Sequence, residues 1–228
     1  GGYNACVGNH CGWNITTATH NVGMGRYVFG SSDGTACTGG DNVAIGNYAM
    51  QKNQSGIRNC ANGYQAMFNN TSGSYNTAMG YKAGETMTTA SNNTFVGAYC
   101  GDSVTTGNEN CAMGSGSLND LTTGAENVCI GTRAGGYSVP LTTGSRNVLI
   151  GRDSYTTAAD SLHQIIIGTY QKQAVGDNTA MINPNGGALY AGNNSSSLST
   201  TSDRRIKKNI IDNTVGLDKI NQIRVRNF

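Results

Sequence analysis

The residues that most often carry chemistry are scattered along this 228-residue sequence. Its cysteines form no C-x-x-C pair, so we expect no zinc site and interpret them as small apolar side chains of the core. His10, His20 and His163 lie too far apart for a metal-ligand or triad motif, and the few carboxylates form no acid–base pair of the glycosidase kind. We therefore expect no metal, no cofactor and no substrate-directed activity. The seven cysteines are Cys6, Cys11, Cys37, Cys60, Cys100, Cys111 and Cys129.

The composition excludes several protein classes. Gly 33, Asn 28, Thr 25 and Ser 18 make up nearly half of the chain, whereas Leu, Ile, Val and Phe together number only 38, too few for a compact enzyme with a thick core. A net charge of +2 and two prolines argue against a self-repelling disordered tail. No stretch approaches the roughly 20 apolar residues of a membrane helix. Without an initiator Met or a signal-peptide pattern, we expect a piece of a longer chain.

An internal repeat dominates the sequence. Asn, two small or β-branched residues, an aliphatic residue and Gly recur, and seven of the nine intervals between copies are 17 residues long. The two exceptions are insertions of four and three residues. The copies begin at Asn4, Asn21, Asn42, Asn59, Asn76, Asn93, Asn110, Asn127 and Asn147, with a weaker tenth copy at Gln164.

The columns of this repeat predict a fold. Glycine occupies the fifth position of all ten copies, which indicates a positive φ or a close backbone approach. The fourth position is aliphatic or Met in nine copies, which predicts a buried stripe, and the eighth is small. Seventeen residues rich in Gly, Asn and Thr are too short and too poor in helix formers for a helical repeat. We therefore predict an all-β parallel β-solenoid (a β-roll) over residues 1–172, with two short strands and a glycine turn in each of about ten coils.

Two further features follow from stacking the coils. The Asn column should form a ladder in which each amide bonds the amides above and below it. Small third and eighth positions leave little core in each coil, so we expect an oligomer, with the fourth-position stripe near the contact between chains.

The repeat fades after about residue 172. Residues 173–201 are predicted to form a short β segment and a Ser/Asn-rich linker. Residues 202–228 carry seven Lys or Arg against three Asp, and apolar residues at 217, 220 and 223 follow a helical spacing. A separate module begins here. Ser202 and Lys207 lie in its first stretch, TSDRRIKKNI, and by spacing alone they are typical of a linker serine beside a solvated basic face.

The repeat motif NVAIGNYA, residues 42–49, and NTAMGYKA, residues 76–83, resembles head repeats of trimeric autotransporter adhesins of the YadA type and repeats in phage and large-virus fibres. The resemblance covers about residues 4–171 and implies a parallel homotrimer. The adhesin repeats form a β-roll of coils shorter than these.

The stretch TSDRRIKKNI, residues 201–210, followed by GLDKINQIR, residues 216–224, resembles the start of the intramolecular chaperone domain of viral tailspikes and tail fibres, the endosialidase type among them. In that family the domain trimerises the fibre and then cleaves itself off. The resemblance implies a Ser/Lys dyad of Ser202 and Lys207, with the scissile bond after Thr201. A desolvated lysine can act as the base that activates a serine.

These resemblances predict a homotrimeric virion fibre, a tail fibre or tailspike, that attaches to a host-surface glycan or protein and contacts other virion proteins. We expect neither nucleic-acid binding nor membrane insertion. The alternatives are a trimeric adhesin head on a bacterial surface, and a depolymerase spike, for which the carboxylate pair is lacking. Tyrosines at the sixth or seventh repeat position are candidates for stacking on sugars: Tyr27, Tyr48, Tyr64, Tyr81, Tyr99 and Tyr170.

Overall fold

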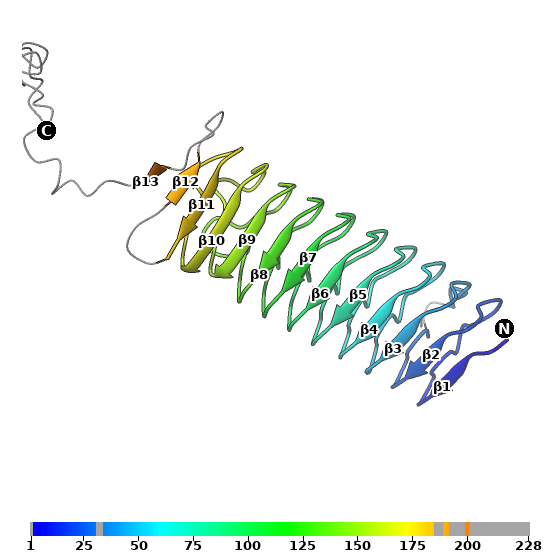
Figure 1. The fold of residues 1–228 in the computed structure, drawn as a ribbon. Coiled ribbons are helices and arrows are strands. Elements are labelled where there is room, and N and C mark those ends of the chain that lie inside the picture. The colour runs from blue at the N-terminus through cyan, green and yellow to red at the C-terminus, as the bar shows by residue number, and fades with distance from the viewer. Residues whose placement is uncertain (1, 31–33, 185–188, 192–198, 201–228) are drawn as a thin grey trace, which may run out of the picture.

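The computed structural model describes residues 2–30, 34–184, 189–191 and 199–200, which form a rod of stacked coils (Figure 1). Eleven strands, β1 to β11, pair in parallel in chain order, and β12 and β13 continue the same sheet antiparallel. The described residues contain no helix. The predicted all-β parallel solenoid of about ten coils is confirmed.

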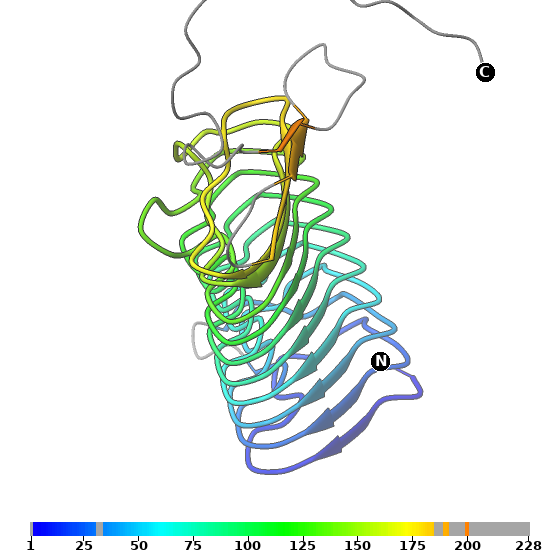
Figure 2. The same cartoon turned by 60° about the vertical axis from the view of Figure 1, so that its left-hand side comes forward.

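Most strands are only three residues long, and each strand from β1 to β10 lies at the start of a repeat. They are β1 (Ala5–Val7), β2 (Val22–Met24), β3 (Val43–Ile45), β4 (Cys60–Asn62), β5 (Thr77–Met79), β6 (Thr94–Val96), β7 (Cys111–Met113), β8 (Val128–Ile130), β9 (Val148–Arg152), β10 (Ile165–Tyr170), β11 (Ala180–Asn183), β12 (Leu189–Ala191) and β13 (Ser199–Thr200). Figure 2 shows the strands of successive coils aligned along one side of the rod.

The strands have an inner and an outer side. In β5 the third repeat position, Ala78, is buried, while Thr77 is half-buried and Met79 is exposed, because successive side chains of a strand point to opposite faces. Register pairs Ala78 with Ala61 below and Phe95 above, so the inner column continues through the sheet. The fourth position therefore faces outward, and the predicted buried stripe is wrong for the single chain. The buried column is the third position.

Each coil holds one strand, not the two predicted. The segments at repeat positions 13 to 15 bond between coils without forming a ladder, since the backbone N–H groups of Thr71 and Ser72 both donate to the carbonyl of Thr88, at 2.9 and 3.1 Å. Left-handed residues also interrupt the far side of every coil, for example Lys82 at φ 56° and Tyr99 at φ 56°. A strand cannot pass through such residues, because extended backbone needs negative φ.

The asparagine ladder is confirmed. Asn93 Nδ2 donates to Asn76 Oδ1 at 3.1 Å and to the Gly107 carbonyl at 3.0 Å, and its own Oδ1 accepts from Asn110 N and Nδ2. The same pattern runs from Asn4 to Asn147, and these side chains are buried from Asn21 onward. At Gln164 only the backbone N–H continues the ladder, at 2.9 Å from Asn147 Oδ1. A buried amide is tolerated here because its hydrogen-bonding atoms have partners.

The glycine at the fifth repeat position is required for both predicted reasons, a positive φ and a close approach of the backbone. Gly97 has a φ of +139°, a region that is essentially restricted to glycine. A Cβ at Gly97 would also lie 2.6 Å from the carbonyl carbon and oxygen of Gly114 in the next coil. Stacked coils approach so closely at this corner that any side chain would force them apart.

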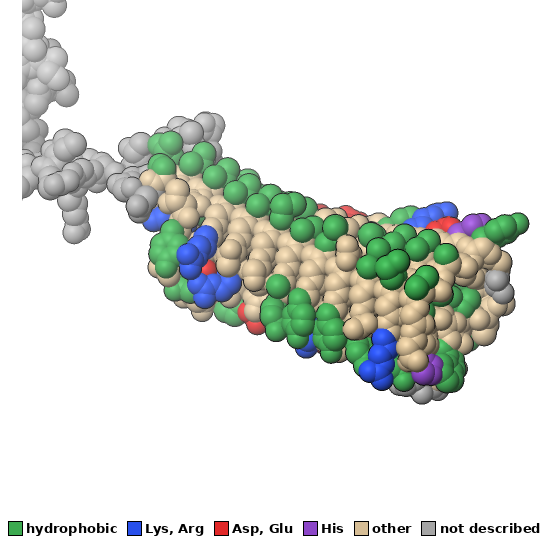
Figure 3. Space-filling model, turned by 90° about the horizontal axis from the view of Figure 1, so that it is seen from below, with side chains coloured by type: hydrophobic (Ala, Val, Ile, Leu, Met, Phe, Trp, Pro, Cys, Tyr) green, Lys and Arg blue, Asp and Glu red, His purple; other side chains and the backbone are tan. Residues whose placement is uncertain are grey.

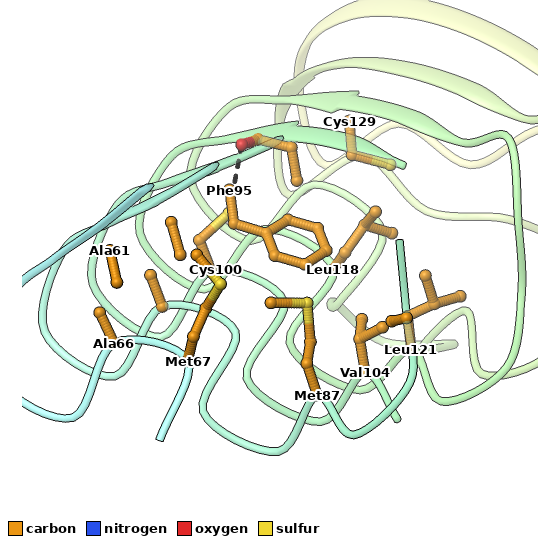
Figure 4. Close-up of a cluster of buried hydrophobic side chains, with 14 of the residues drawn as sticks. Ala61, Ala66, Met67, Met87, Phe95, Cys100, Val104, Leu118, Leu121 and Cys129 are labelled. Atoms are coloured by element: carbon orange, nitrogen blue, oxygen red, sulfur yellow. Dashed lines mark hydrogen bonds between the residues drawn. The ribbon is translucent and has the colours of Figure 1, made fainter. Parts of the chain in front are cut away.

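Different repeat positions supply the large side chain of the narrow core in different coils (Figure 4). Met67, at the ninth repeat position, shares its coil with the polar Asn70 at the twelfth position, both buried. Two coils later the ninth position is Gly101, and the ring of Phe95 fills the space that a Cβ there would need, at 2.8 Å. The complementary choice keeps each coil at similar volume, as close packing requires.

Residues 173–201, predicted to hold a short β segment and a linker, contain β11, β12 and β13. Residues 202–228, including Ser202 and Lys207, lie outside the described residues.

Candidate binding surfaces

The outer side of the sheet carries a largely apolar face, interrupted by Asn62, Thr77 and Thr94, which we call the outer apolar face. It consists of the second and fourth repeat positions, which lie on the same side of every strand. The fourth-position side chains of Met24, Met79 and Met113 are 53%, 43% and 47% exposed. Others on this face that are exposed are Val7, Val22, Val43, Ile45, Ile130, Ile165, Ile167 and Ile182.

Such a face is unusual for a protein that works as a single chain. Parallel pairing places each fourth-position residue directly above the previous one, as for Ile130 and Ile150, so the apolar side chains form a row along the rod. Rows of hydrophobic side chains are visible along the rod in Figure 3. A large contiguous apolar patch marks an interaction site, because it stays in contact with water until a partner covers it.

The last position of each repeat borders this face with polar or charged side chains, and several of them pair along the rod. Asp41 lies 3.8 Å from His20 Nδ1 in the coil below and 3.6 Å from Arg58 Nε in the coil above. Arg146 and Glu126 pair in the same way at 3.0 Å, and that hydrogen bond lowers the pKa of Glu126. Exposed pairs of this kind add little stability, but they neutralise charge next to the apolar face.

The predicted tyrosine positions come together as a ladder. Rings of Tyr27, Tyr48, Tyr64, Tyr81 and Tyr99 follow one another with centroids 5.2 to 5.8 Å apart, alternating between stacked and edge-on contacts. Each ring in this ladder is partly covered by its neighbours, face to face or edge to face. The ladder presents less ring face for stacking on a sugar than isolated tyrosines would.

Tyr170 lies apart from that ladder, in a group that we name the arginine–tyrosine cluster: Arg133, Arg152, Asp153, Tyr137 and Tyr170. The carboxylate of Asp153 is fully buried and accepts hydrogen bonds from Arg133 Nε at 2.7 Å and Nη2 at 3.1 Å. Arg152 Nε lies 3.4 Å from Oδ2 of the same carboxylate, the oxygen that also accepts from Arg133 Nη2. One buried anion thus fixes two guanidinium groups, and the cluster has a net charge of +1.

Both guanidinium groups also lie over aromatic rings. Arg133 Cζ is 5.1 Å from the centroid of Tyr137, and Arg152 Cζ is 5.2 Å from that of Tyr170. The hydrogen bond to Asp153 raises the pKa of Arg133. The side chains of Arg133 and Arg152 are 45% and 58% exposed, so their charge faces solvent.

The three-residue insertion of the eighth repeat places Tyr137 in this cluster. In the seventh coil, Leu121 N–H bonds the carbonyl of Leu118, three residues back, whereas Leu141 N–H bonds that of Gly135, six residues back. The extra residues therefore lie between Gly135 and Leu141. Gln171 Nε2 donates to the Tyr137 hydroxyl at 2.7 Å, which ties the insertion to the tenth coil.

Other reactive groups in the described part of the chain are structural. All seven cysteines are free. Cys37, Cys100 and Cys129 are buried as predicted, whereas Cys6 is exposed and the other three are half-buried. Burial raises the pKa of Cys100 to about 12, so its thiol stays protonated. Burial also raises the pKa of Asp102 to about 6, with smaller contributions from Asp120 and Glu85. Its Oδ1 is buried without a hydrogen-bond partner.

The sequence prediction missed the arginine–tyrosine cluster. Arg133 and Asp153 both occupy the seventh position of adjacent repeats, 20 residues apart, so the alignment of repeats already places opposite charges in register. Among the described residues, no group of three or more His, Cys, Asp or Glu side chains could hold a metal ion, and no helix could cross a membrane.

No protein-family model matches the chain, and no curated protein or solved structure is detectably similar to it.

Proposed function

We propose that residues 1–172 form the shaft of a homotrimeric virion fibre, which attaches the particle to a host surface. The outer apolar face carries this proposal. Two further copies of the chain would cover it, and burial of apolar area at about 25 cal/mol per Å² is the largest favourable term in such an association. The resemblance to fibre and adhesin repeats supports the number three.

The geometry of the face favours parallel copies. A rotation axis along the rod brings each coil next to the equivalent coil of its neighbours, so every rung of the face meets a chemically identical rung. At the border of the contact, Asp41 and Glu126 are already paired with arginines of their own chain. An antiparallel arrangement would place the first coils against the last, where the outer residues differ in size.

The assembly can be tested with the purified chain. Light scattering and chemical cross-linking should give a trimer, and the double variant Met79→Glu with Met113→Glu should be a monomer that keeps its β-sheet circular dichroism. Thr106→Glu, on an exposed turn away from this face, should remain trimeric. A monomeric parent protein, or a trimer unaffected by both glutamates, would refute the assembly.

By resemblance, the segment from Thr201 onward would cleave itself in the full-length protein. Ser202 Oγ would attack the Thr201 carbonyl carbon while Lys207 takes the hydroxyl proton and returns it to the departing Ser202 amine, and water would then hydrolyse the resulting ester. Ser202→Ala should abolish release of the C-terminal fragment, whereas Ser199→Ala should not. Unchanged cleavage in Ser202→Ala would remove the dyad assignment.

A further inference from the structure

We propose that the arginine–tyrosine cluster is a binding site for an acidic glycan. The inference rests on the proposed attachment function and assigns it a place on the shaft and a class of ligand. Figure 3 shows basic side chains gathered around an acidic one near the end of the rod that is joined to the grey atoms.

The buried carboxylate is the first argument. Other coils carry Tyr, His, Gln, Lys, Arg or Gly at the seventh position, whereas Asp153 is an acidic residue and is 0% exposed. A buried carboxylate is costly unless it is paired, and here two arginines pair with it. The arrangement fixes both guanidinium groups before any ligand arrives, which lowers the entropy that binding must lose.

The imbalance of charge is the second argument. Two guanidinium groups share one carboxylate, and Arg133 makes both of its short hydrogen bonds to it. Arg152 makes the longer contact, at 3.4 Å, and has the more exposed side chain. Arg152 is therefore the group that can accept a second anion, and a planar guanidinium binds carboxylate or sulfate oxygens in pairs.

The tyrosines decide the kind of anion. Arg152 Cζ lies over the ring of Tyr170, which is 47% exposed, so apolar ring surface is accessible next to the cation. Tyr137 is fixed edge-on against Tyr155, with centroids 5.9 Å apart. A flat apolar surface beside a guanidinium fits a ligand with both a ring and an acidic group, which describes a sugar acid or a sulfated sugar better than a free inorganic ion.

The insertion is the third argument. Insertions in repeat coils form loops on one face of the solenoid, and that face is often the binding face. The insertion of the eighth coil carries Tyr137 to Arg133, and Gln171 fixes it there.

The test is an array of carboxylated, sialylated and sulfated oligosaccharides printed beside their neutral parents, probed with the full chain. Acidic members should bind and neutral ones should not, and added salt should weaken binding because the site is exposed. Arg152→Gln and Tyr170→Ala should each reduce affinity by about 10-fold or more, as loss of a charged hydrogen bond or a ring contact does. The matched control is Arg26→Gln, since Arg26 lies over Tyr27 at 4.9 Å on a distant coil.

Binding to none of the acidic glycans, or equal binding by Arg152→Gln and the parent, would overturn this inference. That result would leave the fibre proposal intact if the protein is still a trimer. A monomer that binds acidic glycans through Arg152 would instead refute the trimer and keep the site.

Discussion

In most sheets the larger apolar side chains face the core, but in this sheet they are more frequent on the outer column than on the inner column. The inner third position holds Ala in four coils, whereas the outer fourth position holds Met, Ile or Val in nine. In most coils the ninth and twelfth positions already fill the interior with residues such as Met67 and Leu121, so the strand contributes a small side chain there. Phe95 is accommodated because the ninth position of its coil is Gly101. Most of the large apolar residues of this sheet therefore lie on the outside of the single chain, with Phe95, Leu149 and Ile166 among the inner exceptions.

The largest expected loss of stability comes from a substitution of the fifth-position glycine, at the corner that follows each strand. Gly97→Ala combines a forbidden φ with overlap against Gly114, and we expect a loss of about 4 kcal/mol in the free energy of unfolding. Chemical denaturation followed by circular dichroism measures this loss. Gly176→Ala is the matched control, because Gly176 has a similar φ of +147° but nothing within 4 Å of its added Cβ. Equal losses in both variants would show that φ alone, without overlap between coils, explains the column.

The second-largest loss of stability should come from removal of an asparagine of the ladder. Asn93→Ala leaves the Gly107 carbonyl and the Asn110 N–H without their partners, which should cost about 2 to 5 kcal/mol. Asn108→Ala serves as control, since Asn108 is exposed and its amide can be replaced by water. If both variants unfold at the same denaturant concentration, the ladder does not stabilise the stack.

The third-largest effect should come from a change of side-chain size on the inner column, compared with a similar change on the outer column. Ala78→Leu overfills the inner column and should destabilise the protein by about 1 to 3 kcal/mol, whereas Met79→Leu on the outer column should change stability by less than about 0.5 kcal/mol. Thermal unfolding of both variants measures the difference. A tolerated leucine at Ala78 would contradict the tightly filled interior.

The smallest effect depends on pH. The folded-state pKa of Asp102, about 6, exceeds the ordinary value of 3.8, so folding favours the protonated form. Stability should therefore fall as pH rises from about 4 to about 6 and then level off, since the folded state must give up a proton that the unfolded state has already lost. Asp102→Asn should flatten this profile in denaturation series between pH 4 and 7, and the exposed Asp160→Asn should not. A profile unchanged by Asp102→Asn would assign the dependence to other groups.

Those features of the fold that depend on one residue type at one repeat position could be predicted from the sequence. The glycine corner and the asparagine ladder are of this kind, since a single local reason applies at every coil. The outward direction of the fourth position could not be predicted, because hydropathy places Met113 inside more readily than Ala112. Only the volume supplied by the ninth and twelfth positions reverses that choice.

The arginine–tyrosine cluster depends on a different kind of information. Its charges could be paired from the repeat alignment, but the contact between Tyr137 and Gln171 crosses 34 residues and depends on the path of an irregular insertion. Insertions carry no repeat pattern, so their conformation is fixed by tertiary contacts alone.

The asparagine ladder also gives the rod an electrical polarity. Every side-chain amide in it points its carbonyl toward the following coil and its NH2 group toward the preceding one, from Asn21 to Asn147. Aligned amide dipoles add head to tail, as peptide dipoles do in a helix. The negative end of this column therefore points toward the ninth and tenth coils, where it favours the positive charge that Arg133 and Arg152 bring to the surface.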